Sequence, residues 1–219
     1  MINLYIINEN ILSAVYGIGT YIKELIAALK GGEINVCVIY LGSERQDMEI
    51  EEFDGIRHWY IPKPTIIYNY QNNEGHVERY YRNVLYLLRL HIIKEENLVF
   101  HINHVDCKPL MDFLKTFFDC KIVLVVHYLT SIMALLGNIS RLRRIISQTN
   151  ELTDKIEKYA KKSYLKEKEM FQFYAVDKIV CLSNHAFDLL HQDYQVDKEK
   201  MVVIYNGLSD SKLMMDNTF

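Results

Sequence analysis

The sequence IVLVVH, at residues 122–127, is a run of five apolar residues that ends in a histidine. Such a short and almost continuous run of Val, Ile and Leu is typical of a parallel strand that is buried on both faces. Further runs of this kind lie along the chain, separated by longer stretches with helical spacing. The expected strands comprise residues 2–7, 34–41, 56–61, 98–102, 122–126, 178–182 and 201–205.

Helical stretches alternate with these strands. The first carries an apolar stripe at helical spacing, formed by Tyr21, Ile22, Leu25, Ile26 and Leu29. The alternation predicts an α/β fold with a doubly wound, Rossmann-like parallel sheet of about seven strands and helices on both faces. In such a sheet, ligands bind beyond the carboxyl ends of the strands, so the site is expected in the loops that follow them.

Size and composition limit the classes of protein that fit. The chain has 219 residues, 50% of them hydrophobic, and a formal net charge of −3. The length fits one large domain or two small ones, and the apolar fraction excludes a disordered chain. Because the net charge is slightly negative, no nucleic-acid partner is expected.

The N-terminus and the cysteines indicate the compartment. The opening MINLYIIN lacks the basic region and the cleavage site of a signal peptide. No apolar run reaches the roughly 18 residues of a membrane span. The four cysteines show neither a CxxC pair nor metal-finger spacing. We therefore expect a cytoplasmic protein with reduced, structural cysteines and no metal ion.

A glycine-containing loop precedes the first helix and includes Tyr16, Gly17, Gly19 and Thr20. Glycines let the backbone approach a ligand closely, and the free amides of a helix N-terminus favour a phosphate. Ile22 stands where the dinucleotide fingerprint G-x-G-x-x-G needs its third glycine, which argues against a nicotinamide cofactor. Either a ligand-facing loop or a flexible connection with a glycine N-cap fits this pattern.

Histidines mark the ends of two consecutive strands. His101 and His104 lie around the end of the strand at 98–102, and His127 follows the strand at 122–126. An imidazole at such an edge can bind a sugar hydroxyl or a phosphate, or transfer a proton near neutral pH. His127 is the main candidate because the chain leaves the sheet there, while a structural role stays open for each histidine. His101 and His104 face opposite sides of an extended strand, so we do not expect them to share a metal.

Residues 138–170 form a long, charged insertion that is expected to be helical. It contains nine Lys and Arg residues against five Asp and Glu residues. One interpretation is a solvated helix that packs by one edge. The other is a basic lid over the carboxyl edge of the sheet that faces an anionic or membrane-linked ligand.

Two later strand ends carry polar residues. Ser183 or Asn184 can cap the helix that follows residues 178–182. Asn206 and Gly207 form a turn signal after the last strand.

The motifs YGIGTYIKEL, VVH, KIVCLSNHA and VIYNGL occur in this order at the strand ends described above. Together they resemble the N-terminal domain of a GT-B glycosyltransferase, specifically a retaining enzyme of family 4. The resemblance covers essentially the whole chain and implies one half of a GT-B enzyme. Residues 1–208 would then be the acceptor-side domain, Asn206 and Gly207 an interdomain hinge, and residues 209–219 the start of a linker.

The resemblance also implies roles for individual residues. Gly17 and Gly19 match the family's glycine loop, which faces the donor diphosphate or the acceptor. His127 matches the strand-end histidine near the transferred sugar and takes the catalytic role. Tyr128 and Tyr205 depart from the family, which often has Asp and Pro at these positions. The candidate acceptor contacts are His104, Tyr128, Ser183 and Asn184.

The expected function is transfer of a sugar from a nucleotide-sugar donor to a polysaccharide or glycolipid acceptor. In the family, a second Rossmann-like domain with an E-x7-E element makes most donor contacts, and no metal cofactor is generally needed. These residues lack that element, so we expect no activity from them alone. Peripheral contact with the inner face of a membrane would suit a lipid-linked acceptor. The alternative is a non-catalytic, Rossmann-like ligand-binding or regulatory module.

Overall fold

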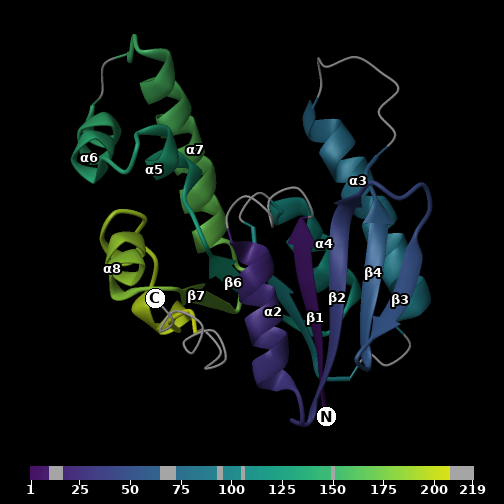
Figure 1. The fold of residues 1–219 in the computed structure, drawn as a ribbon. Coiled ribbons are helices and arrows are strands. Elements are labelled where there is room, and N and C mark those ends of the chain that lie inside the picture. The colour runs from purple at the N-terminus through teal and green to yellow at the C-terminus, as the bar shows by residue number, and fades with distance from the viewer. Residues whose placement is uncertain (10–16, 65–72, 93–95, 105–106, 149–150, 208–219) are drawn as a thin grey trace, which may run out of the picture.

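The computed structural model describes residues 1–9, 17–64, 73–92, 96–104, 107–148 and 151–207. The strands form one sheet in the order β3-β4-β2-β1-β5-β6-β7-β8 (Figure 1). All neighbouring strands are parallel except the antiparallel pair β3–β4. The strands are β1 (Ile2–Glu9), β2 (Ile34–Ser43), β3 (Glu49–Phe53), β4 (Ile56–Pro62), β5 (Leu98–Ile102), β6 (Cys120–Val126), β7 (Lys178–Cys181) and β8 (Met201–Val203). The doubly wound parallel sheet predicted from the sequence is confirmed, with β3 as an additional, antiparallel strand.

β3 is the strand that the hydrophobic pattern did not predict. Its sequence EIEEF has four exposed residues out of five, because it lies at the edge of the sheet. It pairs with β4 through a tight turn at Asp54 and Gly55, whose φ angles are 53° and 75°. Acidic side chains on an edge strand discourage pairing with another chain, which explains why this strand lacks an apolar run.

Helices cover the sheet unequally. α2 lies on one face, while α3, α4, α7 and α8 lie on the other (Figure 1). The described helices are α2 (Ile18–Leu29), α3 (Asn73–His91), α4 (Lys108–Phe117), α5 (Thr130–Ala134), α6 (Ile139–Ser147), α7 (Lys155–Gln172) and α8 (Asn184–Gln192). α2 is the one described helix on its face of the sheet, and the polar residues at the strand ends contact it there.

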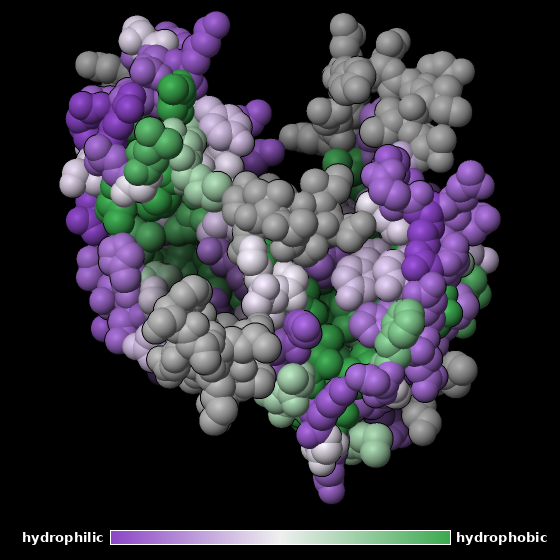
Figure 2. All heavy atoms as spheres, in the orientation of Figure 1, coloured by the Kyte–Doolittle hydropathy of each residue, from purple (hydrophilic) through white to green (hydrophobic). Residues whose placement is uncertain are grey.

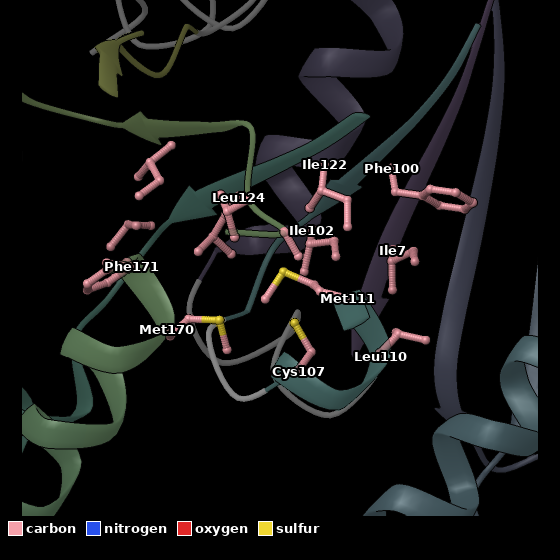
Figure 3. Packing of buried hydrophobic residues seen from close by; sticks show 14 of the residues in the cluster. Ile7, Phe100, Ile102, Cys107, Leu110, Met111, Ile122, Leu124, Met170 and Phe171 are labelled. Atoms are coloured by element: carbon pink, nitrogen blue, oxygen red, sulfur yellow. The ribbon is translucent and has the colours of Figure 1, made fainter. Parts of the chain in front are cut away.

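Alternating side chains of β1 divide the core between the two faces. Leu4 and Ile6 belong to the smaller cluster, which includes the α2 residues Ile18 and Ile22. Ile7 belongs to the larger cluster on the opposite face. In Figure 3 the larger cluster includes side chains from β5, β6, α4 and α7. Strands buried on both faces require nearly continuous apolar sequences, as β6 has.

The charged insertion at 138–170 folds as part of a helical unit between β6 and β7. α5, α6 and α7 make up this unit, and α6 and the N-terminal part of α7 extend beyond the carboxyl ends of the strands (Figure 1). Figure 2 shows hydrophilic residues on the outer flank of α6 and of the upper end of α7. The unit therefore rises beside the edge of the sheet where a ligand is expected.

All four cysteines are buried as free thiols. Burial raises the pKa of the Cys37 thiol to about 12 and that of Cys181 to about 11, so both stay protonated. Among the described residues, no group of three His, Cys, Asp or Glu side chains could hold a metal ion. None of the described helices has the length and apolarity of a membrane span.

Candidate active site

The carboxyl ends of β5 and β6 bring polar side chains together beside α2. The two strands are parallel neighbours, so the chain leaves both at the same edge of the sheet. His101 lies in β5, Asn103 follows that strand, and His127 follows β6. Tyr21, from the first half of α2, completes the group. We call Tyr21, His101, Asn103 and His127 the imidazole cluster.

Asn103 is the centre of this cluster. Its Nδ2 atom donates to the carbonyl of Ile7 at 3.2 Å and lies 3.3 Å from Nδ1 of His101. Its Oδ1 atom lies 2.9 Å from Nε2 of His127. The chain of contacts continues from Nε2 of His101 to the Tyr21 hydroxyl at 3.1 Å. Hydrogen bonds thus join the end of β6 to α2.

Ring contacts hold the same side chains in place. The Tyr21 ring meets the His127 ring edge to face, with centroids 4.8 Å apart, and stacks on His101 at 5.8 Å. Ile22, the next residue of α2, is buried against the sheet and anchors the helix at this level. The position of Tyr21 therefore follows from the packing of α2.

The environment keeps the cluster uncharged at neutral pH. Burial lowers the pKa of His127 to about 4. Burial also lowers the pKa of His101 to about 4, and the neighbouring His127 contributes in the same direction. Burial raises the pKa of Tyr21 to about 12. Near pH 7 both imidazoles are therefore neutral, with one hydrogen-bond donor and one acceptor each.

The glycine loop leads into α2 directly before the cluster. Gly17 is the N-cap residue with a φ of 69°, a conformation that favours glycine, and its carbonyl accepts from the Tyr21 amide at 3.1 Å. The cap makes no side-chain hydrogen bond. Gly19 and Thr20 are exposed in the first turn, where helix amides have no intrahelical acceptor. Tyr16 lies outside the described residues.

Gly19 also lines a shallow groove on the side of α2 that faces β2 and β4. The groove has a volume of about 330 Å³ and is lined partly by Lys23, Tyr40 and His58. Tyr21 is not among its lining residues. The groove and the imidazole cluster are therefore separate features of α2.

The other candidate acceptor contacts occupy different settings. His104 is 3% exposed, and its backbone carbonyl accepts from the Cys107 thiol at 3.0 Å. Tyr128 is half-buried and packs against the smaller core cluster on the α2 side. Ser183 caps α8 by accepting from the Ala186 amide at 3.1 Å. Asn184 is exposed at the start of α8.

The two residues predicted to form a turn after the last strand follow β8 in an irregular stretch of the chain. Asn206 and Gly207 are exposed there. The preceding Ile204 amide donates to the Cys181 carbonyl at 3.0 Å, which extends the contact between β7 and β8. Residues 209–219, expected to begin a linker, lie outside the described residues.

The arginines of α6 pair with acidic side chains of the same chain. Arg141 and Arg144 both contact Glu157, at 2.8 and 2.7 Å. Arg143 binds both carboxylate oxygens of Asp193, at 2.7 and 2.9 Å. These pairs hold α6 against α7 and the end of α8, which favours the structural interpretation for this part of the insertion.

Neither Tyr21 nor Asn103 was predicted to belong to the site. Tyr21 belongs to the apolar stripe of its helix, and its hydroxyl carries no signal in that pattern. Asn103 lies in a loop, where an asparagine is ordinary. An amide between two strand-end histidines, followed by a third histidine on the next strand, was the signal that could have identified Asn103.

The profile of Glycosyltransferase Family 4 matches residues 15–212. No curated protein sequence matches the chain. Among solved structures, sucrose-phosphate synthase from Thermosynechococcus elongatus has a TM-score of 0.60 and 14% identity, over 99% of this chain and 53% of that one.

Two further solved structures are similar in fold. A glycosyltransferase from Rickettsia africae has a TM-score of 0.55 and 13% identity, covering all of this chain and 46% of its own. The UDP-forming α,α-trehalose-phosphate synthase from Burkholderia vietnamiensis has a TM-score of 0.56 and 8% identity, with 51% of its own chain covered. The chain thus spans about half the length of these structures. Its sequence and fold show that it belongs to glycosyltransferase family 4 and corresponds to the N-terminal half of a GT-B enzyme.

Proposed function

We propose that this chain is the acceptor-side half of a retaining hexosyltransferase. The enzyme would transfer a sugar from a nucleotide-sugar donor to a polysaccharide or glycolipid acceptor. The observation that carries this proposal is the imidazole cluster, which lies where β5 and β6 end and contacts α2 one turn from its first amides. Membership of family 4 and the match to half of each solved structure support it.

The geometry suits the charge changes of glycosyl transfer. As the bond to the sugar breaks, negative charge develops on the departing diphosphate, and free first-turn amides of a helix stabilise such charge. Among the described residues other than its chain neighbours, no heavy atom lies within 4 Å of a Cβ placed on Gly17, the N-cap of α2. The neutral His127 ring can hydrogen-bond a sugar hydroxyl and hold it in the reacting orientation.

We also propose that the donor is held mainly by a second domain and that transfer needs no metal ion. The first-turn amides of α2 can bind a diphosphate without a metal ion. Transfer by the complete enzyme should then continue in EDTA. The chain of 219 residues should show no appreciable transfer alone.

The test is a transfer assay on a protein that joins this chain to its donor-binding half. His127→Ala should lower turnover by roughly a hundredfold, the range found for positioned acid–base and hydrogen-bonding groups. The variant also leaves the buried Asn103 oxygen without its donor, so the free energy of unfolding should fall by about 1–3 kcal/mol and turnover is compared under conditions where both proteins are folded. The matched control is His185→Ala, since His185 is exposed on α8.

Three results would contradict the proposal. Turnover by His127→Ala equal to that of the wild type would contradict the proposed role of His127 in transfer. Transfer by the isolated chain would contradict the proposal that the donor is held mainly by a second domain. Binding of nucleotide sugars by the joined protein without any transfer would favour the non-catalytic module.

We propose that the protein is cytoplasmic and contacts the membrane through α7. Lys155, Tyr159, Lys162 and Lys166 are exposed and share one face of this helix by their spacing. Within the described residues these lysines form no ion pair, in contrast to the arginines of α6. Basic residues with an interfacial aromatic suit an anionic bilayer surface.

Vesicle binding tests this contact. Replacing Lys155, Lys162 and Lys166 with Gln should weaken binding to phosphatidylglycerol-containing vesicles by about tenfold or more at low salt, since each surface cation contributes about 1 kcal/mol. The control replaces Arg141, Arg143 and Arg144, which are already paired, and should have a smaller effect. Equal losses in both variants, or no binding by the unmodified chain, would contradict the proposed contact.

A further inference from the structure

We propose that Asn103 is a positioning residue that fixes the tautomers of two histidines, placing the proton on Nε2 in both His101 and His127. The proposal deepens the proposed function because it concerns the same site and rests on that site for its catalytic consequence. The tautomers themselves follow from hydrogen-bond geometry and can be tested without sugar transfer.

The orientation of the Asn103 amide is the first step. A backbone carbonyl can only accept a hydrogen bond, so the side-chain atom 3.2 Å from the Ile7 carbonyl must be the NH2 group. Asn103 is 1% exposed, so its amide is shielded from bulk water. β1 therefore determines which way the amide of Asn103 points.

The tautomer of His127 follows from that orientation. With the NH2 group facing Ile7, the amide oxygen faces Nε2 of His127 at 2.9 Å. An amide oxygen only accepts, so Nε2 of His127 must carry a proton. In the neutral ring, Nδ1 then holds the lone pair. No other described residue forms a hydrogen bond with this ring.

The tautomer of His101 follows from the second amide proton. The NH2 group of Asn103 lies 3.3 Å from Nδ1 of His101, so Nδ1 accepts and the ring proton sits on Nε2. Nε2 in turn donates to the Tyr21 oxygen at 3.1 Å. The hydroxyl proton of Tyr21 is then directed away from His101 and can be donated elsewhere.

The hydrogen bonds of Asn103 require a neutral His101 ring, whereas a charged His127 would still donate from Nε2 but would lose its acceptor at Nδ1. A proton on Nδ1 of His101 would point at the NH2 group of Asn103, two donors facing each other. The lowered pKa values of both histidines, caused first by burial, keep them neutral near pH 7. Asn103 uses both its donors and its oxygen inside this network, as a buried amide should.

The network therefore ends in two groups whose hydrogen-bonding roles are fixed. His127 offers an acceptor at Nδ1, and Tyr21 offers a donor. An acceptor and a donor of fixed identity suit two hydroxyl groups of a sugar, because a hydroxyl can both donate and accept. A partner that fixes a histidine tautomer also fixes which atom can serve in catalysis.

Nitrogen NMR of the histidine rings tests the proposal on the chain itself. In uniformly labelled protein at pH 7, long-range proton–nitrogen spectra report which ring nitrogen of each histidine is protonated. We expect a protonated Nε2 in both His101 and His127. In Asn103→Asp, the carboxylate oxygen that replaces the NH2 group can accept from His101, so the His101 proton moves from Nε2 to Nδ1 while His127 keeps its Nε2 proton; the Ile7 carbonyl loses its donor. Asn35→Asp is the matched control, since Asn35 is a strand amide hydrogen-bonded to Asn3 instead of the cluster.

The outcomes decide between a positioning role and a packing role. A protonated Nδ1 and unprotonated Nε2 in wild-type His101 or His127, or an unchanged His101 in Asn103→Asp, would overturn the proposal. The wild-type spectrum decides alone if the Asn103→Asp protein does not fold. Observing the expected tautomers while His127→Ala retains full transfer would contradict the proposed function and leave the role of Asn103 intact.

Discussion

Two buried polar networks lie at different places in this fold, and they differ in how they end. The imidazole cluster joins Tyr21 to His127 at the carboxyl edge of the sheet. The second network consists of Ser131, Glu167 and Tyr194, which we call the carboxyl cluster. It lies among α5, α7 and the segment after α8, on the face of the sheet opposite α2.

The carboxyl cluster closes on itself. The Ser131 amide and hydroxyl donate to the two oxygens of Glu167 at 3.2 and 2.5 Å. The Tyr194 hydroxyl lies 3.1 Å from the same carboxyl group and 2.6 Å from the Ser131 hydroxyl. The imidazole cluster instead ends in a histidine acceptor and a tyrosine donor that its own hydrogen bonds leave unused. A closed network stabilises helix packing, whereas an open one at a strand end can bind a ligand.

The largest effect is expected from opening the closed network. Glu167→Ala should lower the free energy of unfolding by about 3 kcal/mol, because it leaves buried hydroxyl and amide groups without their acceptor and creates a cavity. Urea unfolding of the chain measures this change. Glu169→Ala is the control on the same helix, since Glu169 is exposed and pairs at the surface with Lys108. A similarly small change in both variants would show that the carboxyl cluster is not structural.

The two networks should also respond to pH with opposite sign. Burial lowers the pKa of His101 to about 4, so between pH 6.5 and 4 the unfolded chain binds a proton that the folded chain does not. Stability from His101 is therefore lost as the pH falls through this window. Burial raises the pKa of Glu167 despite its hydrogen bonds, so stability from Glu167 is present below its unfolded pKa of 4.5 and is lost as the pH rises through its folded pKa.

Unfolding experiments across this pH range separate the two signs. The free energy of unfolding of the wild type, relative to that of His101→Gln, should fall by about 1 kcal/mol or more between pH 6.5 and pH 4. The free energy of unfolding of the wild type, relative to that of Glu167→Gln, should fall as the pH rises above 4.5. Parallel slopes for the two variants would contradict the distinction between the networks.

The same contrast explains what the sequence could reveal. A buried parallel strand needs a nearly continuous apolar sequence, so β6 and the position of His127 at its end could be predicted. β3 could not, because an exposed edge strand has no such pattern. Asn103 and Tyr21 became site candidates only when the strand order placed β5 between β1 and β6, with α2 against that face. The partners of Arg143 and Glu167 lie 50 and 36 residues away, and no local spacing encodes such contacts.

The smallest effect is expected at Ser183, which was a candidate acceptor contact at another strand end. Its hydroxyl accepts from the Ala186 amide at 3.1 Å and caps α8, so its acceptor is used within the fold, as in the carboxyl cluster. Ser183→Ala should therefore lower the free energy of unfolding by about 1 kcal/mol, the usual cost of losing an N-cap. Sugar transfer should stay within about twofold of wild type, because Ser183 is not part of an open network.

Asn184→Ala provides the comparison, since Asn184 is exposed and makes no cap. A tenfold fall in transfer without loss of stability would instead place Ser183 in the acceptor site. A hydrogen-bonded helix cap could then also bind a ligand, which would contradict the distinction between closed and open networks.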